Sequence, residues 1–203
     1  MNFKDLYQVI DKNRYYVFSK NDLLTFFPQE KTGSLKKAIY RWKKKKWISP
    51  LKKGIYELTY PKDFLIPDMY VANHLYGPSY VSLETALSNY SIIPEVSLAV
   101  TSVTTKPTRR FKNKHGLFIY RTIRPAAFTG YYIEKVSGFD VLMAEPEKAI
   151  VDFLYLKAYH NKELDLEAER LDKDRLAGLK RVKLDKYAKL YGIDLEKTLY
   201  AYL

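Results

Sequence analysis

The chain has 203 residues, of which 47% are hydrophobic, and it carries a net charge of +12 at pH 7. This apolar content is sufficient for a folded core and argues against general disorder. The absence of cysteine excludes disulfides and cysteine-ligated zinc, and no stretch reaches the roughly 18 apolar residues of a membrane span. Because the first residues also lack the apolar core of a signal peptide, we expect a soluble cytoplasmic protein with no membrane partner.

The positive charge is concentrated at the start of the chain. Residues 1–60 contain 14 lysines and arginines against 5 acidic residues, so they carry +9 of the total charge of +12. Such an asymmetry is typical of a dedicated polyanion-binding module. We therefore expect one domain at residues 1–60 and a second at residues 61–203, with the boundary near Pro61.

The N-terminal domain begins with two predicted helices. Apolar residues at helical spacing predict a first helix over residues 3–12. Ser19 is a good N-cap for a second helix, which Pro28 ends.

A third helix is predicted over residues 34–46 and has two different faces. Ser34 stands at the expected N-cap position, after Gly33. One face is apolar and consists of Leu35, Ala38, Ile39 and Trp42. The rest of the surface carries Lys36, Lys37, Tyr40, Arg41, Lys43 and Lys44.

A β-hairpin follows this basic helix directly. Strands are predicted over residues 47–51 and 55–59, with a turn at Lys52, Lys53 and Gly54. Three helices followed by a hairpin are the order of a winged helix-turn-helix, so double-stranded DNA is the expected partner. The alternative is a cationic helix that is merely solvated.

The DNA-binding hypothesis assigns roles to individual side chains. Arg41 could form a bidentate contact with guanine in the major groove, and Lys52 and Lys53 could contact the adjacent backbone or the minor groove. About six phosphate contacts would give a slope of about −5 for log affinity against log salt. The candidate DNA-binding residues are Ser34, Lys36, Lys37, Tyr40, Arg41, Lys43, Lys44, Lys52 and Lys53.

The second domain is expected to be mixed α/β. The predicted elements are helices over residues 68–75, after Ser82 and from Pro146, strands over residues 97–105, 116–124, 131–136 and 139–144, and short helices broken near Gly178 and Gly192. The whole chain is thus expected to be α+β, with a winged helix-turn-helix followed by a small sheet and C-terminal helices.

Hydroxyl and guanidinium donors gather at the end of one predicted strand and in the loop after it. They are Thr104, Thr105, Thr108, Arg109 and Arg110. Phosphate or nucleotide recognition needs such donors. The same group could instead extend the DNA-binding surface, meet an acidic partner or form an exposed basic turn.

Charged residues at predicted helix starts, such as Glu84, Glu145 and Glu147, need no role beyond complementing the helix dipole.

A series of motifs in the second domain resembles the AbiEi family of antitoxins. The segments are PSYVSLETAL at 78–87, IPE at 93–95, VTSVTT at 100–105, PTRRF at 107–111, YR at 120–121, GY at 130–131 and AEPEKAIVD at 144–152. They occur in order over residues 76–156, although Ser91 stands where the family pattern has glycine.

The resemblance implies a type IV toxin–antitoxin, or abortive-infection, system. Such proteins repress their own two-gene operon by binding inverted repeats in its promoter. They also counter a nucleotidyltransferase-like toxin without forming a stable complex with it. We expect a monomer or weak dimer that pairs on DNA, and we assign antitoxin function to Thr105, Thr108, Arg109 and Arg110.

Catalysis is not expected, and neither is a metal or a cofactor. A PD-(D/E)xK nuclease needs a carboxylate and a lysine two residues apart on one strand face, whereas Glu147 and Lys148 are adjacent and Pro146 predicts a helix. The three histidines have no ligand-like spacing, and no glycine-rich phosphate loop is present. The main alternative is a winged-helix regulator whose second domain senses a ligand or forms a dimer.

Overall fold

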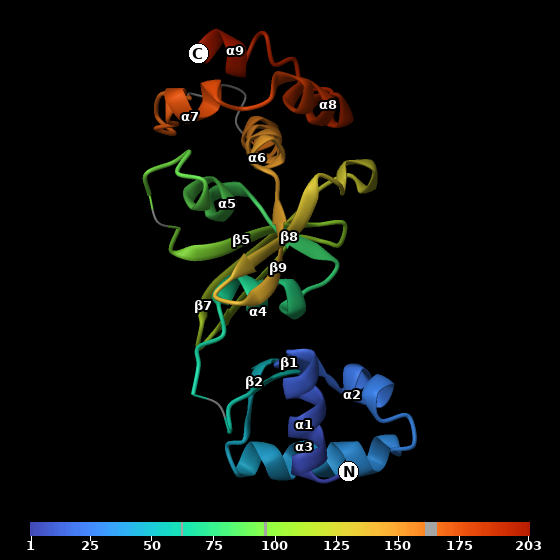
Figure 1. Cartoon of the computed structure of the whole chain (residues 1–203). Helices are drawn as coiled ribbons and strands as arrows, with labels where there is room; N and C mark the ends of the chain where they lie inside the picture. The colour runs from blue at the N-terminus through green and yellow to red at the C-terminus, as the bar shows by residue number, and fades with distance from the viewer. Residues whose placement is uncertain (62, 96, 161–165) are drawn as a thin grey trace.

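The computed structural model describes residues 1–61, 63–95, 97–160 and 166–203 (Figure 1). Within these ranges the chain forms nine α-helices and two β-sheets, one of three strands and one of six. The expected α+β class is confirmed. None of the helices in the described ranges is both long and apolar enough to cross a bilayer.

The N-terminal unit, residues 1–60, contains the three-stranded sheet. Its elements are α1 (Phe3–Asn13), β1 (Val17–Ser19), α2 (Lys20–Phe26), α3 (Thr32–Lys44), β2 (Ile48–Lys52) and β3 (Ile55–Leu58). Strand β3 lies between β1 and β2 and is antiparallel to both. The hairpin therefore forms where the sequence predicts it, and the unpredicted strand β1 extends it.

The helix starts of this unit differ in their capping. Asn2 and Ser19 each form a capping box, which satisfies free backbone N–H groups of α1 and α2. The prediction that Ser34 caps the basic helix is wrong. Helix α3 begins at Thr32 after the extended residue Lys31, without a side-chain cap, and Ser34 lies in its first turn. Gly33 is helical here rather than part of a turn.

The C-terminal unit, residues 61–203, contains the six-stranded sheet. Its first elements are α4 (Asp68–Leu75), β4 (Ser79–Val81), α5 (Leu83–Asn89), β5 (Ala99–Thr104), β6 (Arg109–Asn113) and β7 (Gly116–Thr122). The later ones are β8 (Tyr131–Val136), β9 (Phe139–Ala144), α6 (Pro146–His160), α7 (Lys173–Ala177), α8 (Arg181–Tyr191) and α9 (Leu199–Tyr202).

The strands of this sheet are ordered β6-β7-β5-β4-β9-β8. The β5–β7 and β4–β9 pairs are parallel, and the other neighbours are antiparallel. The prediction of a small sheet is wrong, because it missed β4 and β6. The segment from Arg109 to Asn113 was expected to start as a loop, but it forms the edge strand β6.

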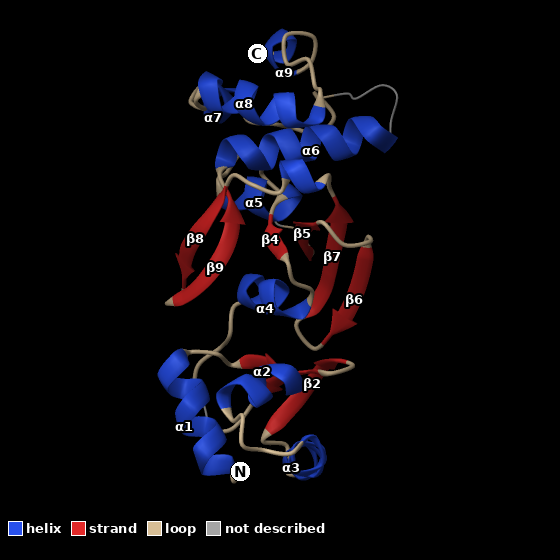
Figure 2. Cartoon of the chain, turned by 90° about the vertical axis from the view of Figure 1, so that its right-hand side faces the viewer, coloured by secondary structure: helices blue, strands red, loops and turns tan. Residues whose placement is uncertain are grey.

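Helices cover the sheet unequally. Helix α4 lies between the sheet and the N-terminal unit, whereas α5, α6 and the C-terminal helices lie toward the other end of the molecule (Figures 1 and 2). The two units touch through α4 and the β8–β9 turn. Tyr70 donates a hydrogen bond to the carbonyl of Arg14 at 2.9 Å, and the Arg14 guanidinium donates to the carbonyl of Gly138 at 2.8 Å.

A histidine joins the two units at a second place. His115, in the β6–β7 turn, has Nε2 at 2.8 Å from the carboxylate of Glu57 on β3 and Nδ1 at 2.8 Å from that of Asp68 on α4. Both partners are acceptors, so both ring nitrogens donate. The hydrogen bonds to Asp68 and Glu57 raise the pKa of His115 to about 9. Lys114 adds an ion pair to Glu57, whose side chain is almost fully buried.

Candidate nucleic-acid interface and neighbouring clefts

Helix α3 is fixed by one buried stripe. Leu35, Ala38, Ile39 and Trp42 are each at most 6% exposed and face the core of the N-terminal unit. The Phe3 ring packs against Trp42 at 5.7 Å and against Trp47 at 4.3 Å, between ring centroids. This anchoring determines which residues of α3 face solvent.

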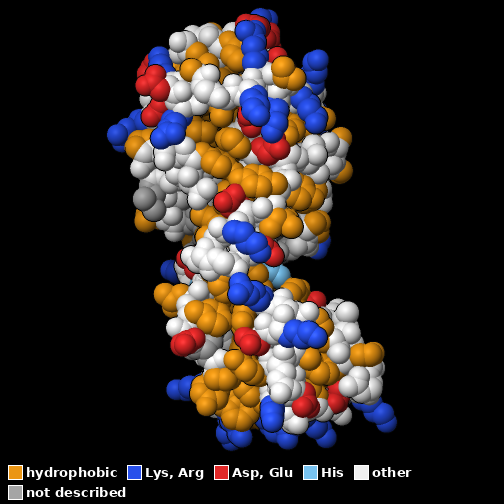
Figure 3. Space-filling view, in the orientation of Figure 1, with side chains coloured by type: hydrophobic (Ala, Val, Ile, Leu, Met, Phe, Trp, Pro, Cys, Tyr) orange, Lys and Arg blue, Asp and Glu red, His pale blue; other side chains and the backbone are white. Residues whose placement is uncertain are grey.

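The opposite face of α3 is cationic and exposed. At 100° per residue, Lys37, Tyr40 and Lys44 lie along the line opposite the buried stripe, and Tyr40 is 68% exposed. No ion pair forms on the lysines or arginine of α3 within the described ranges, and the helix contains no acidic residue. Lysine and arginine side chains accordingly gather at the lower edge of Figure 3, where α3 lies.

One side of this face is hollowed. The residues that line the shallow hollow are Ser34, Lys36, Lys37, Tyr40 and Arg41. Five of the predicted DNA-binding residues therefore share one continuous surface, and Lys43 and Lys44 follow them, exposed, on the last turn of the helix.

The two lysines of the hairpin have different surroundings. The Lys52 ammonium lies 4.4 Å from the ring centroid of Phe111 and 5.1 Å from that of Tyr76, both in the C-terminal unit. Burial lowers the pKa of Lys52, and Lys106 adds to this effect. Lys53 is exposed at the tip of the hairpin. Lys52 thus contacts the junction between the units, and only Lys53 presents its charge freely to solvent.

The predicted group of threonines and arginines is divided by the sheet. Thr104 is fully buried and donates to the carbonyl of Pro78, so it has a structural role. Arg109 pairs with Tyr120 across the β6–β7 ladder and Arg110 with Ile119. Successive residues of a strand point to opposite faces, so only Arg110 faces the side covered by α5 and α6.

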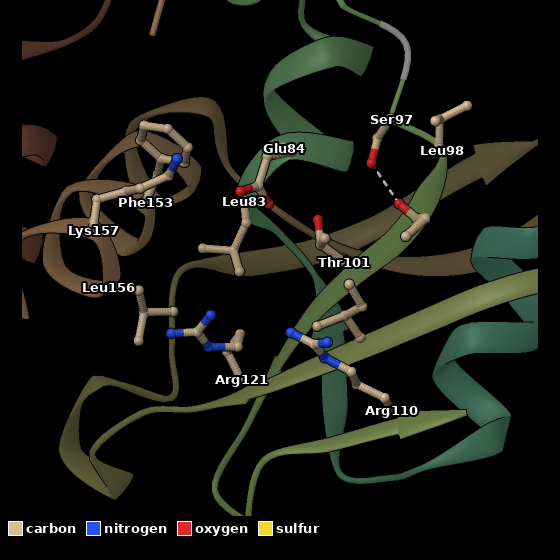
Figure 4. Close-up of a pocket in the computed structure, with 12 residues that line it drawn as sticks. Leu83, Glu84, Ser97, Leu98, Thr101, Arg110, Arg121, Phe153, Leu156 and Lys157 are labelled. Atoms are coloured by element: carbon tan, nitrogen blue, oxygen red, sulfur yellow. Dashed lines mark hydrogen bonds between the residues drawn. The ribbon is translucent and has the colours of Figure 1, made fainter. Parts of the chain in front are cut away.

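On that side, Arg110 lines a cleft of about 530 Å³, which we call the arginine cleft (Figure 4). Its floor is the β5–β7–β6 face, and its walls are α5 and α6. The lining residues are Leu83, Glu84, Ser97, Leu98, Ala99, Thr101, Arg110, Ile119, Arg121, Phe153, Leu156 and Lys157.

The charges in the arginine cleft are arranged asymmetrically. Arg110 and Arg121 extend from neighbouring strands of the floor, whereas the carboxylate of Glu84 lies on the α5 wall (Figure 4). Neither arginine has a side-chain hydrogen bond or an ion pair within the described part of the chain. Lys157 is paired with Glu169 at 2.7 Å. The two guanidinium groups are therefore available to a ligand.

A second cleft, of about 680 Å³, adjoins the first and shares Arg121 and Leu156 with it. It is lined by Thr105, Thr108, Arg121, Thr122, Ile123, Arg124, Pro125, Tyr155 and Leu156. The Thr108 and Thr122 hydroxyls are 3.1 Å apart. The structure thus brings Thr105, Thr108 and Arg110 to two adjoining clefts and leaves Arg109 on the opposite face.

A buried polar network, which the sequence did not predict, joins α6 to α8 and to the segment that precedes α5. Lys148 and Asp152, one turn apart on α6, form an ion pair with no solvent exposure. Asp152 also accepts hydrogen bonds from the hydroxyls of Ser82 at 2.9 Å, Tyr80 at 3.1 Å and Tyr191. Ser82 precedes α5 as predicted, but its hydroxyl bonds to Asp152 rather than capping the helix. Desolvation lowers the pKa of Lys148.

Glu145, at the start of α6, is held by the C-terminal helices. Lys183 and Tyr187 of α8 each donate to its carboxylate at 2.8 Å. Desolvation acts to raise the pKa of Glu145, but these two hydrogen bonds outweigh it and the pKa is lowered. Gly130 is required beside them, because it has φ +73° and a Cβ there would lie 2.7 Å from the Tyr187 ring.

The described residues contain no candidate metal centre, and comparison with protein families and curated proteins identifies no relative. In the described ranges, no three histidine, aspartate or glutamate side chains are grouped so that they could hold a metal ion. A comparison with known protein families finds no match, and a comparison with curated proteins finds none either.

Proposed function

We propose that this chain is a DNA-binding antitoxin that represses its own operon. In this proposal residues 1–60 act as a winged helix-turn-helix, with α3 as the recognition helix and the β2–β3 hairpin as the wing. The C-terminal unit neutralises a nucleotidyltransferase-like toxin without a stable complex, and the chain has no enzymatic activity of its own.

The proposal of DNA binding rests on the exposed face of α3. Lysines, Tyr40 and Arg41 project from a helix whose other side is anchored in the core, and no acidic side chain of the described residues forms an ion pair with them. A B-form major groove accommodates one helix, in which such side chains contact phosphates and base edges. Lys53 at the hairpin tip supports a wing contact, whereas Lys52 is left out of the proposed interface because it packs against Phe111.

The antitoxin half is supported by the resemblance of residues 76–156 to the AbiEi family. Several of the resembling motifs have defined positions in the C-terminal unit. The AEPEKAIVD segment supplies Lys148 and Asp152 to the buried network, and Tyr80 and Ser82 come from the PSYVSLETAL segment. These motif residues are therefore expected to maintain the fold, and the cleft-lining motif residues Arg110 and Arg121 to carry the function.

A duplex-binding titration tests the first half. Fluorescence anisotropy of a labelled duplex from upstream of the gene should show affinity that falls with log salt at a slope of about −5. The triple variant Lys36→Gln, Lys37→Gln, Lys43→Gln should lose binding. The charge-matched control Lys186→Gln, Lys189→Gln, Lys197→Gln, on α8 and in the turn before α9, should bind as the parent does. Equal losses in both variants would show that only net charge matters.

Growth rescue tests the second half. The full-length triple variant of α3 should still protect cells from the product of the adjacent gene while failing to repress a promoter reporter. A folded variant that loses both properties, together with ligand-dependent release of DNA by the parent chain, would favour the alternative of a ligand-sensing regulator. The two open clefts of the C-terminal unit give that alternative a specific basis.

A further inference from the structure

The arginine cleft has cationic donors on its floor and a carboxylate acceptor on one wall. Arg110 and Arg121 lie on one side and Glu84 on the other, with Leu83 between them, and Phe153 lines the cleft from α6 (Figure 4). Neither guanidinium has a partner in the described part of the chain. A ligand that fills this cleft must therefore present an anionic end, an apolar or aromatic body and hydrogen-bond donors.

We propose that the arginine cleft binds a nucleoside phosphate. The phosphate lies between Arg110 and Arg121, the base packs against the apolar wall, and Glu84 accepts hydrogen bonds from ribose hydroxyls or a base amino group. This inference goes beyond the proposed function, because neither promoter binding nor toxin neutralisation requires a small ligand.

The phosphate end follows from strand geometry. Arg110 is paired with Ile119, and Arg121 is two residues further along β7, so the two arginines are diagonal neighbours on one face of the sheet. Guanidinium groups present planar forks of donors that match phosphate oxygens, and such charge-assisted bonds are the strong ones. Two unpaired forks on adjacent strands can therefore hold one phosphate from two directions.

The volume and the charges of the arginine cleft favour a nucleoside beside the phosphate. A volume of about 530 Å³ lies within the usual range of small-molecule sites, which are mostly apolar with a few convergent polar groups. Glu84 would repel a second phosphate at its wall but would accept from hydroxyl or amino donors. A polyanion without a nucleoside would leave both the carboxylate and the apolar wall unused.

The adjoining cleft offers donors for additional phosphates of the same ligand. It shares Arg121 with the arginine cleft and adds Arg124 and the hydroxyls of Thr105 and Thr108. A phosphate chain that starts between Arg110 and Arg121 can extend in this direction, away from Glu84. Nucleoside triphosphates are therefore expected to bind more tightly than monophosphates.

Isothermal titration calorimetry of the full chain tests the proposal with ATP, GTP, AMP, adenosine and inorganic tripolyphosphate as probes. The triphosphates should bind best, and both adenosine and tripolyphosphate should bind at least about tenfold more weakly. The double variant Arg110→Gln, Arg121→Gln should weaken nucleotide binding by about tenfold or more, as expected for lost charge-assisted bonds. Arg109→Gln is the matched control, since it removes the same charge from the opposite face, and it should bind as the parent does.

Two further variants complete the design. Glu84→Gln should reduce the preference for ATP over tripolyphosphate, because a charged acceptor for the nucleoside is replaced by a weaker neutral one while the phosphate site is kept. The α3 triple variant should bind nucleotides normally, which separates this result from any failure of DNA binding. Arg110 is solvent-exposed, so Arg110→Gln alone serves if the double variant unfolds.

Three results would overturn the proposal. The first is no heat of binding from any nucleotide at millimolar concentration. The second is tripolyphosphate binding as tightly as ATP, which would identify a simple polyanion site. The third is an equal loss of affinity in Arg109→Gln and Arg110→Gln, which would show that the cleft is not the site.

Discussion

Arg109 and Arg110 are consecutive in β6, yet their side chains leave the six-stranded sheet on opposite faces. Arg110 lines the arginine cleft beside Arg121, whereas Arg109 lies on the face that Tyr120 and α4 share. The two residues have the same charge and neighbouring positions, so they form a matched pair for testing which face of the sheet is functional.

In the growth-rescue assay we expect Arg110→Ala to impair toxin neutralisation more than Arg109→Ala does. The reason is that Arg110 and Arg121 are the unpaired guanidinium groups of the arginine cleft. Promoter binding, measured by anisotropy, should be unchanged in both variants. A stronger defect in Arg109→Ala would assign the activity to the α4 face instead.

Replacement of single residues on α3 should distinguish base contacts from phosphate contacts. Arg41→Ala should weaken binding to the specific duplex by about 1–3 kcal/mol and relax sequence preference. Lys44→Ala should weaken all duplexes similarly and reduce the salt slope by about 1. Lys189→Ala, on the exposed side of α8, is the control and should change neither quantity. If both α3 variants bind with parental affinity and slope, α3 is not the recognition helix.

The junction between the units should be sensitive to alkaline pH through His115. Its pKa of about 9 in the folded chain is above the ordinary value of 6.5, because the charged imidazole bonds to Asp68 and Glu57. The stabilisation of the folded chain by protonated His115 is therefore complete below about pH 6.5 and is lost as the pH rises through about 9. Urea unfolding of the parent between pH 6.5 and 9.5 should show this loss, and His115→Gln should show a flatter profile. Parallel profiles for the two proteins would contradict the assignment.

The buried pair on α6 should be intolerant of single replacement. Lys148→Met leaves the Asp152 carboxylate buried without its cation, a change that costs about 3–5 kcal/mol of unfolding free energy in comparable cases. Lys148→Met combined with Asp152→Asn should cost less than the sum of the two single changes, because no uncompensated charge remains. Additive losses in urea unfolding would show that the pair is not coupled.

The elements that the sequence predicted correctly have strong local signals. Helix α4 and strands β8 and β9 occur at the predicted residues, because clear periodicity is bounded there by proline or glycine. Strands β1 and β4 have only three residues each and exist through their sheet partners, which local sequence does not specify. Strand β6 reads RRFKN and resembles a basic loop, although charged residues are usual on edge strands.

The candidate sites were predictable to different extents. The exposed residues of α3 follow directly from helical periodicity, although the predicted helix starts and ends two residues too late. The arginine cleft was not predictable, because Glu84, Arg110 and Arg121 come from three elements and Lys157 from a fourth. The spacing of Lys148 and Asp152, four residues apart on a largely apolar helix, was the available signal for the buried network.

The tyrosines of α8 determine how this protein can be divided experimentally. Tyr191 bonds to the buried Lys148 and Asp152, and Tyr187 bonds to Glu145. In a fragment that ends before residue 191, Lys148 and Asp152 would stay buried without the Tyr191 hydroxyl as a hydrogen-bond partner. Expression plasmids for the second half of the chain should therefore retain α8, since shorter products would be prone to misfold and precipitate.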